Sequence, residues 1–599
     1  MKKIYKNRLL SVLLSFVLLL SGCSLPSKNS EQHNSNTITN EAPAKARDEN
    51  IQASFDVLLD NLFKEEVITD TLTLHYTLAD PASFGISSYP ITLGDSNRET
   101  FNNAMEEIRE LLESLKSFSY DSLTEKQQLT YDVLTDYLEN QLALSDYYLY
   151  YEDLSPLLGI QAQLPVLLAE YPFYTETDIT DYLMLLEQIP KYFEQILAFE
   201  KEKAEAGLFM SDTILSDTIS QCRDFIKEPE ENYLIASFEH RLASYEGLTE
   251  ETKNTYLEQN KSSILNVVIP TYENLIQELE NLKGSGKNEG GLCNFEKGKE
   301  YYTALLKANT GSSRSPEEIM ELLNKQLESD YSAMEDLLKK KPSLASEIAT
   351  YKFPLSDPAE ILEDLKEKIK EDFPTPPEAK YEIKYVDSSM EEHLSPAFYL
   401  TPTLDRPQEN VIYINNYFQY NKLSLYTTLA HEGYPGHLYE SVFAASNDMP
   451  AIRYLLNYSG YSEGWATYVE MYSYGLADMD KDISTLLQKN SSVTLCLYSI
   501  LDIGIHYEGW DMKTVKAFLQ PYGITSDSAV KSVYQAVVQD PVNYLKYYLG
   551  YLEFVDLKEQ TQTRLGDKFV LKDFHRAILD IGPASYSVVK KHLEKTLIS

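Results

Sequence analysis

The sequence predicts a mainly α-helical protein with one small β-sheet placed directly before its most distinctive helix. Apolar residues recur at helical spacing through most of the chain, and three short β-like runs lie close together between residues 381 and 415. With 599 residues, of which 43% are hydrophobic, the chain is long enough to form a large folded body.

The first helical region covers residues 51–282. Its apolar residues recur at i, i+3, i+4 and i+7, which predicts helices over Thr100 to Phe118, Thr124 to Tyr148 and Asp178 to Glu205. The glycine-rich run at 282–291 is the strongest chain breaker in the folded part. We therefore expect a domain boundary or a long surface loop there.

The second region, residues 292–599, contains the predicted sheet and the chemically distinctive helices, and it can be continuous with the first. Ser315 is a predicted helix cap, because a proline follows it and a glutamate stands three residues after it. Helical spacing returns at Leu423 and continues almost to the end of the chain. The three β-like runs are Tyr381 to Val386, Ala397 to Leu400 and Val411 to Asn415.

The amino terminus has the form of an export signal. Basic residues precede an apolar run of about a dozen residues, which is too short to cross a bilayer. The run leads into Leu20-Ser21-Gly22-Cys23, which resembles the lipobox of bacterial lipoproteins. We expect a signal peptide at 1–22, lipidation of Cys23 with attachment to the outer face of the cell membrane, and a flexible polar tether at 23–50. The alternative is an ordinary secretion signal with an incidental cysteine.

The charge balance excludes one class of partner. The chain has 92 Asp and Glu against 53 Lys and Arg, a net charge of −39, and removal of residues 1–22 takes away four cations, which leaves −43. Because so acidic a surface repels phosphate backbones, we expect no nucleic-acid partner.

The cysteines indicate neither a disulfide framework nor a cysteine metal site. Apart from Cys23, the chain has Cys222, Cys293 and Cys496, an odd number at wide spacing. A disulfide between Cys222 and Cys293 stays open at this point.

The chemistry is concentrated in the segment His431-Glu432-Gly433-Tyr434-Pro435-Gly436-His437. In an HExxH helix, two histidines four residues apart reach the same zinc ion. Here the histidines are six residues apart, and on a regular helix their rings would point about 240° apart. Pro435 interrupts helical hydrogen bonding and Gly436 tolerates unusual backbone angles. We therefore predict a helix with a two-residue bulge that restores an effective spacing of four.

A third metal ligand is expected from the next helical segment, which contains Glu463 and Glu470. These residues are seven apart and share one helix face, so one can bind the metal while the other orients a histidine from behind. We assign Glu463 as the ligand beside His431 and His437, and Glu470 to the outer position. Glu470 and Glu440 are the reserve ligands.

This donor set predicts a catalytic site. Two histidines and one carboxylate leave a zinc coordination position for water, whose pKa zinc lowers toward about 7. Glu432 follows a ligand directly and is placed to take the proton of the water and pass it to a leaving amine. We therefore expect Zn²⁺ as the cofactor and peptides as the substrate.

The same residues carry a family resemblance. The run at 431–437 and Glu463-Gly464-Trp465-Ala466 resemble the bacterial family called domain of unknown function 885, and weaker matches continue at 502–506, 547–550 and 574–575. The resemblance covers most of residues 51–599. It implies a zincin-like metallopeptidase core, in a family with many lipoproteins.

Three further features complete the predicted site. Asp502 and His506 are four residues apart on a predicted helix, so the carboxylate is placed to orient the imidazole. Tyr547 carries a phenol that can donate to a developing oxyanion. The family resemblance implies that His506 and Tyr547 stabilise the transition state. We also expect Val411 to Asn415 to be an edge strand that pairs with an extended peptide.

The sequence thus predicts a lipid-anchored, extracytoplasmic zinc metallopeptidase. Two alternatives stay open: a non-catalytic, metal-containing lipoprotein that binds peptides or acts as a scaffold, and a zinc amidase that acts on cell-wall fragments. Exo- versus endo-cleavage, side-chain preference, the native metal and the oligomeric state are also open.

Overall fold

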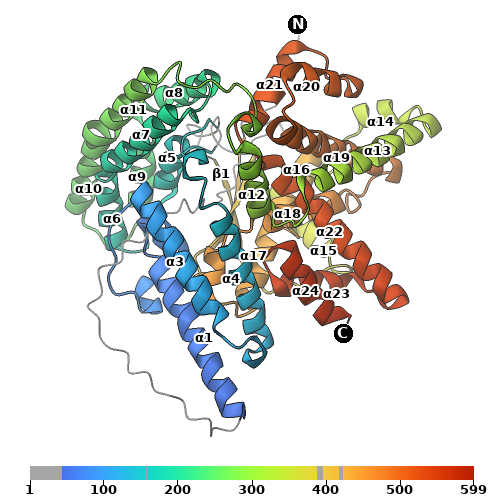
Figure 1. Cartoon of the computed structure of the whole chain (residues 1–599), viewed down its shortest axis with the longest axis horizontal. Coiled ribbons are helices and arrows are strands. Elements are labelled where there is room, and N and C mark those ends of the chain that lie inside the picture. Colours follow the sequence, from blue (N-terminus) through green and yellow to red (C-terminus); the bar gives the residue numbers. More distant parts are fainter. Residues whose placement is uncertain (1–43, 157, 387–390, 392–395, 417–421, 599) are drawn as a thin grey trace.

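The computed structural model describes residues 44–156, 158–386, 391, 396–416 and 422–598. Within these residues the chain is mainly helical and contains a three-stranded sheet (Figure 1). The predicted signal peptide, Cys23 and most of the tether lie outside them. None of the helices in the described part of the chain is both long and apolar enough to cross a membrane.

Helix α1 (Ala44–Glu66) begins inside the stretch expected to be a tether. Its first residues include Ala44, Lys45, Ala46 and Arg47, all of which are strong helix formers, and this explains the early start. The other helices before the glycine-rich segment are α2 (Thr71–Thr77), α3 (Arg98–Lys116), α4 (Glu125–Ala143), α5 (Ile160–Glu170), α6 (Glu176–Leu186), α7 (Ile189–Ala206), α8 (Asp212–Ile226), α9 (Tyr233–Ser244), α10 (Glu250–Ser263) and α11 (Ile269–Asn281).

Two of the predicted helices have different bounds in the structure. The helix expected over Thr124 to Tyr148 ends at Ala143, shortly before a Ser-Asp pair that favours turns. The helix expected over Asp178 to Glu205 is interrupted between α6 and α7. Pro190, in the first turn of α7, explains this break because it has no N–H with which to continue the preceding helix.

The helices of the second region follow the glycine-rich loop. The predicted cap is confirmed: the Ser315 hydroxyl accepts the Glu318 N–H, and the Glu318 carboxylate accepts the Ser315 N–H. The helices are α12 (Gly298–Thr310), α13 (Pro316–Lys340), α14 (Leu344–Thr350), α15 (Pro358–Lys368), α16 (Lys422–Glu432), α17 (His437–Ser446), α18 (Ser459–Ser473), α19 (Lys481–Ile503), α20 (Met512–Leu519), α21 (Asp527–Val538), α22 (Asn543–Leu565), α23 (Leu571–Ile581) and α24 (Tyr586–Leu597).

The sheet has the strand order β1-β3-β2. The strands are β1 (Tyr381–Tyr385), β2 (Ala397–Leu400) and β3 (Asn410–Ile414), so all three predicted runs are confirmed. β3 pairs in parallel with β1 and antiparallel with β2. The expectation that Val411 to Asn415 is an edge strand was wrong, because β3 is central and both of its sides are paired.

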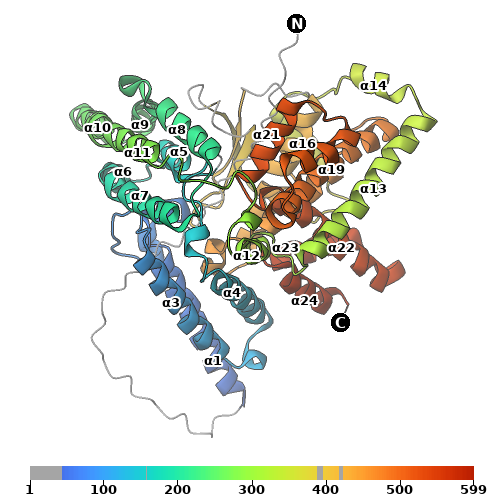
Figure 2. The same cartoon turned by 45° about the horizontal axis from the view of Figure 1, so that its top comes forward.

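The sheet lies between the amino-terminal helices α5–α11 and the helices that follow the sheet in sequence, from α16 onward (Figure 2). Phe398 of β2 packs into the core of the amino-terminal helices. Tyr399, Ile412 and Ile414 pack into the core that contains α16, α17 and α18. Because successive side chains of a strand point to opposite faces, β2 contributes to both cores.

The hydrophobic cores join segments that are far apart in the sequence. Ile452 and Leu455 pack into the core formed by α1 to α4, and Leu144 packs with residues of α12, α13, α19 and α22. Cys222, Cys293 and Cys496 are all free, so no Cys222–Cys293 disulfide forms. The described fold therefore depends on apolar packing.

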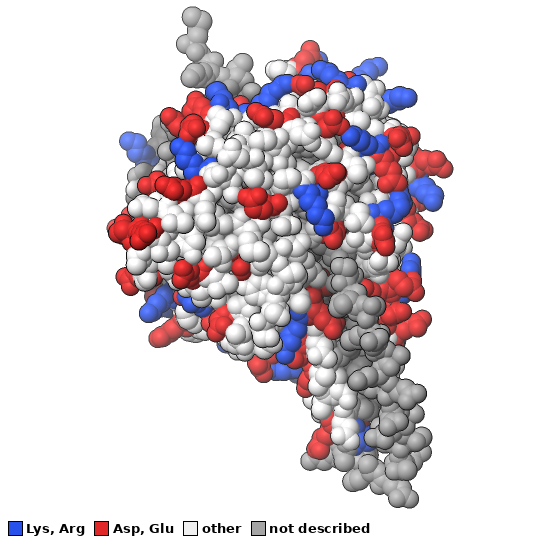
Figure 3. Space-filling view, turned by 90° about the vertical axis from the view of Figure 1, so that its left-hand side faces the viewer, with Lys and Arg blue, Asp and Glu red and all other residues white. Residues whose placement is uncertain are grey.

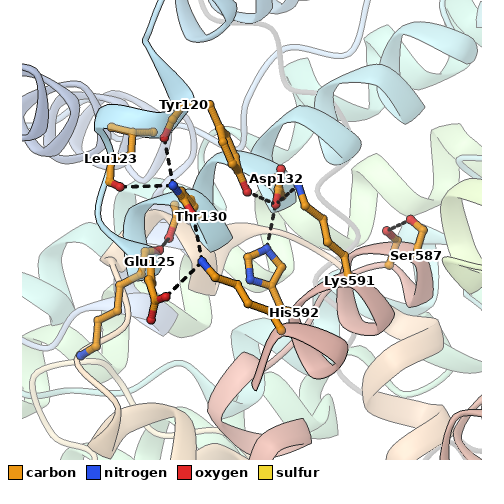
Figure 4. Close-up of polar contacts among 12 residues, drawn as sticks. Tyr120, Leu123, Glu125, Thr130, Asp132, Ser587, Lys591 and His592 are labelled. Carbon is orange, nitrogen blue, oxygen red and sulfur yellow. Dashed lines mark hydrogen bonds and ion pairs between the residues drawn. The ribbon is translucent and has the colours of Figure 1, made fainter. Parts of the chain in front are cut away.

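A group of polar contacts joins α4 to the last helix, α24 (Figure 4). Asp132 of α4 accepts hydrogen bonds from His592 of α24 at 2.7 Å and from Tyr120 at 2.9 Å, and Lys591 lies 2.7 Å from the same carboxylate oxygen. Because Asp132 is largely buried, these contacts compensate the loss of its hydration.

The surface carries charges of both signs. On the face shown in Figure 3, Lys and Arg are interspersed with Asp and Glu and form no basic patch.

Candidate metal centre

The HEGYPGH segment forms two helices joined by a tight turn. α16 ends at Glu432 and α17 begins at His437, so the prediction of one bulged helix was wrong. Gly436 is required in the turn, since a Cβ there would lie 1.7 Å from the carbonyl oxygen of His431. The break nevertheless brings the histidines together, and their ring centroids are 4.9 Å apart.

The turn is held by buried neighbours. The indole N–H of Trp465, on α18, donates to the carbonyl of Pro435 at 3.0 Å. Leu362 and Ile412 pack so closely against Gly433 that a Cβ there would lie 2.4 Å from the Leu362 side chain. The turn is therefore held in place by α15, α18 and β3.

Three side chains from three helices converge next to this turn. They are His431 at the end of α16, His437 at the start of α17 and Glu463 on α18, and all three are buried. Oε2 of Glu463 lies 3.6 Å from Nε2 of His431 and 3.8 Å from Nε2 of His437. One ligand atom from each residue lies within 4.8 Å of the others.

The chemistry of this cluster fits a metal ion. Nε2 of His437 and Oε2 of Glu463 are buried and have no hydrogen-bond partner among the described residues. A buried polar atom without a partner costs about 1–3 kcal/mol, and a metal ion bonded to both would satisfy them. Two atoms on one tetrahedral zinc ion lie roughly 3.4 Å apart, close to the observed separations.

A second layer of carboxylates stands behind the histidines. Oε2 of Glu470 lies 3.1 Å from Nδ1 of His431, and Oε2 of Glu440 lies 4.0 Å from Nδ1 of His437. A carboxylate at Nδ1 keeps Nε2 directed toward the cluster. Glu440, expected only as a reserve ligand, takes this outer position. Its spacing of three residues from His437 on a helix is the signal that could have revealed it.

Glu432 is held next to the cluster by the sheet. Its Oε2 accepts the backbone N–H of Tyr399, in β2, at 3.0 Å. Burial raises the pKa of Glu432, although His431 and His437 act in the opposite direction. Burial alone would lower the pKa of His431, but the neighbouring carboxylates of Glu463 and Glu470 raise it well above the ordinary value.

Tyr547 reaches the cluster from α22. Its ring stacks against that of His431, with the centroids 6.3 Å apart and the planes at 25°. α18 and α22 approach closely because Gly464 and Gly550 face each other, and a Cβ on Gly464 would lie 2.6 Å from the Gly550 backbone. This packing brings Glu463 and Tyr547 to the same centre.

The structure does not give the predicted interaction between Asp502 and His506. α19 ends at Ile503, and His506 lies in the wider helical turn that follows. Nδ1 of His506 accepts the N–H of Leu292 at 3.2 Å, and Nε2 donates to the carbonyl of Val537 at 3.0 Å. Burial lowers the pKa of His506 to about 4, so the ring is neutral.

Asp502 has partners of its own. It accepts the hydroxyl of Tyr302 at 2.6 Å and the N–H of Val542 at 2.8 Å. The hydrogen-bonding atoms of both side chains are therefore engaged by the surrounding fold, and the transition-state role expected for His506 stays a prediction.

The fold and site define a mainly helical protein with a buried His-His-Glu cluster beside a small sheet. The chain belongs to the family described as bacterial protein of unknown function (DUF885), and the match covers residues 82–593. No curated protein matches the chain.

Two solved structures share the fold. One is the crystal structure of a protein described as a putative lipoprotein from Colwellia psychrerythraea, with 20% identity and a TM-score of 0.79 over 92% of this chain and 99% of that chain. The other is described as a putative lipoprotein of unknown function from Shewanella oneidensis, with 14% identity and a TM-score of 0.60 over 89% of this chain and 98% of that chain. At these identities, the likeness shows the fold alone.

Proposed function

We propose that the protein is a zinc-dependent peptidase with a zincin-like core. The observation that carries this proposal is the convergence of His431, His437 and Glu463, in which two facing ligand atoms are buried without another partner among the described residues. Two imidazoles and one carboxylate are a donor set of catalytic zinc sites.

Each neighbouring residue has a defined part in this proposal. When bound, zinc supplies a Lewis acid and a water of lowered pKa. Glu432 accepts the proton of the attacking water and passes it to the leaving amine. Glu470 and Glu440 hold the histidine rings in place. Tyr547 donates a hydrogen bond to the oxygen of the scissile carbonyl.

The peptide would lie along β2. Among the described residues, β2 pairs with β3 alone, and the N–H of Tyr399 points to Glu432. The outer side of β2 therefore borders the catalytic glutamate, and an extended peptide pairing with it would pass next to the centre. This assignment replaces the central strand β3 as the docking strand.

The test is to purify the mature protein, measure bound zinc by mass spectrometry and assay a broad peptide library. Glu432→Gln should retain zinc and lose activity by about 10²-fold or more, while Glu559→Gln, at an exposed position on α22, should behave like the wild type. His437→Ala should bind zinc poorly.

Three results would contradict the proposal. Full activity of Glu432→Gln would remove the assigned base. A zinc-loaded protein that cleaves nothing in the library would favour a peptide-binding or scaffold role. Cleavage confined to cell-wall amide bonds would favour an amidase.

We also propose that lipid on Cys23 attaches the protein to the outer face of the cell membrane after removal of residues 1–22. The lipobox-like Leu20-Ser21-Gly22-Cys23 supports this, as does the description of both structural relatives as putative lipoproteins.

A further inference from the structure

A cavity of about 300 Å³ opens beside the metal centre, and His437 and Glu463 form part of its wall. This volume lies at the lower end of the range for ligand sites, a size suited to one amino acid residue. Among the described residues that line it, Arg453 is the only lysine or arginine. It belongs to a short helical turn, Ala451–Leu455, between α17 and α18.

The guanidinium of Arg453 is buried and only partly satisfied. Arg453 is 5% exposed. Its Nη2 donates to the carbonyls of Ile581 at 2.9 Å and Pro583 at 2.8 Å. Nε is buried and has no hydrogen-bond partner among the described residues. Burial lowers the pKa of Arg453 to about 10, so it is still cationic at neutral pH.

A buried cation normally has an anion beside it, because the charge loses its hydration. Lys203, which is also fully buried, lies 2.7 Å from a carboxylate oxygen of Glu152. Arg453 has no comparable carboxylate among the described residues, and the titratable neighbours that oppose the effect of burial on its pKa are tyrosines. The cavity contains two acids, Glu440 and Glu463, but both lie beside His437, at 4.0 and 3.8 Å.

We propose that Arg453 binds the terminal carboxylate of a peptide whose last residue occupies this cavity. The inference rests on the proposed peptidase function and makes the protein a carboxypeptidase. Both N–H groups of Nη2 are donated to Ile581 and Pro583, so a peptide carboxylate would be bound by the charge of the guanidinium and by its other N–H groups. In the reaction one water is consumed: a C–O bond forms at the last peptide carbonyl, the C–N bond breaks, and the leaving nitrogen receives a proton through Glu432.

The rest of the peptide has space in a neighbouring cavity of about 1350 Å³. The two cavities share Tyr76, Leu400, Thr401 and Pro402 in their walls, so they meet at the end of β2. The larger cavity lies between β1 and β3 on one side and residues of α9 on the other. The substrate class is therefore oligopeptides with a free carboxyl terminus.

The first test compares one amino-blocked oligopeptide as the free acid and as the carboxyl-terminal amide, with the zinc-loaded wild type. A hydrogen-bonded charge pair corresponds to a factor of about 10 to 100, so kcat/KM should be lower for the amide by that factor. Mass spectrometry should show loss of the last residue from the acid. Equal rates for both peptides, or cleavage at internal bonds, would overturn the inference and leave the proposed peptidase function intact.

The second test measures binding to the metal-free protein by calorimetry, so that zinc cannot bind the carboxylate. Acetyl-phenylalanine should bind about 10 to 100 times more tightly than its amide. Preference for the acid without any peptide cleavage would contradict the proposed function and keep the carboxylate site. Equal binding of the two ligands would contradict the carboxylate site.

The third test uses variants. Arg453→Met should remove the preference for the acid in both assays, Arg453→Lys should retain part of it, and Arg98→Met, at an exposed position on α3, should leave it unchanged. Because Arg453 also contacts the end of α23, the folding of each variant is checked by circular dichroism. If Arg453→Met does not fold, the wild-type comparisons decide the question.

Discussion

At the residue scale, the candidate centre has two layers of side chains. His431, His437 and Glu463 face one another, and Glu470 and Glu440 stand behind the two histidines. The outer carboxylates fix the ring orientation and increase the basicity of the imidazoles. The inner and outer layers therefore act together on any bound metal.

Replacing Glu470 by glutamine should weaken zinc binding by about 10 to 100-fold, because the amide can still accept a hydrogen bond from His431 but carries no charge. Competition with a chromophoric chelator measures the dissociation constant. Glu559→Gln is the control at an exposed site. An affinity within twofold of the wild type would show that Glu470 does not support the metal centre.

Sequence spacing predicted some of these residues and not others. Residues seven positions apart lie on the same face of a helix wherever that helix begins. The spacing of Glu463 and Glu470 was therefore enough to identify both. The partners of His506 were not predicted, because spacing of four residues from Asp502 says nothing about the backbone groups that other segments bring to its ring. Arg453 has no motif, and only its burial beside the cavity distinguishes it.

At the scale of elements, the centre depends on close packing between α18 and α22. Gly464 and Gly550 allow this approach, and the hydroxyl of Tyr586 lies between them, where its single O–H is shared between the carbonyl oxygens of Gly460 at 2.7 Å and Gly550 at 3.1 Å. Glu463 is adjacent to one of these glycines. A change in the spacing of the two helices would therefore move a proposed ligand.

Gly464→Ala should destabilise the fold by about 1–3 kcal/mol, because its Cβ would lie 2.5 Å from the Tyr586 hydroxyl and 2.6 Å from the Gly550 backbone. Urea unfolding measures the change in the free energy of unfolding. Gly475→Ala is the matched control, since the nearest atom to its Cβ is 3.4 Å away, and it should change stability by less than about 0.5 kcal/mol. Equal stability of the two variants would contradict the packing argument.

The strands show where local sequence stops being informative. Their positions follow from short runs of residues that favour strands, and all three were predicted. Their order was not, because the pairing of β3 with both neighbours depends on contacts between residues that are distant along the chain. The proposed docking edge is therefore the outer side of β2, in place of the run at residues 411–415.

At the scale of the whole molecule, the acidic body and the proposed lipid anchor have different effects. The net charge of −39, or −43 after the proposed removal of residues 1–22, repels anionic lipid, and none of the described helices is long and apolar enough to cross a bilayer. Attachment would therefore rest on the acyl chains of Cys23.

Cys23→Ser should move the protein from the membrane fraction to the wash fraction, because it removes the thiol that would carry the lipid. Immunoblotting of fractions washed at low and high salt measures the distribution. Cys293→Ser, at a half-buried free thiol, is the control and should stay with the membrane. Membrane retention of Cys23→Ser would refute the anchor.

The sequence by itself determined the helical class, the three strands, the cap at Ser315 and the residues that supply the candidate ligands. These features depend on local periodicity and on residue types, which are readable along the chain. Only the tertiary structure decided that α16 and α17 meet at a turn and that β3 is central. It also decided that Glu440 lies behind His437 and that the ring of His506 contacts backbone groups. Each of these depends on segments folded against one another, because burial and hydrogen-bond partners come from distant parts of the sequence.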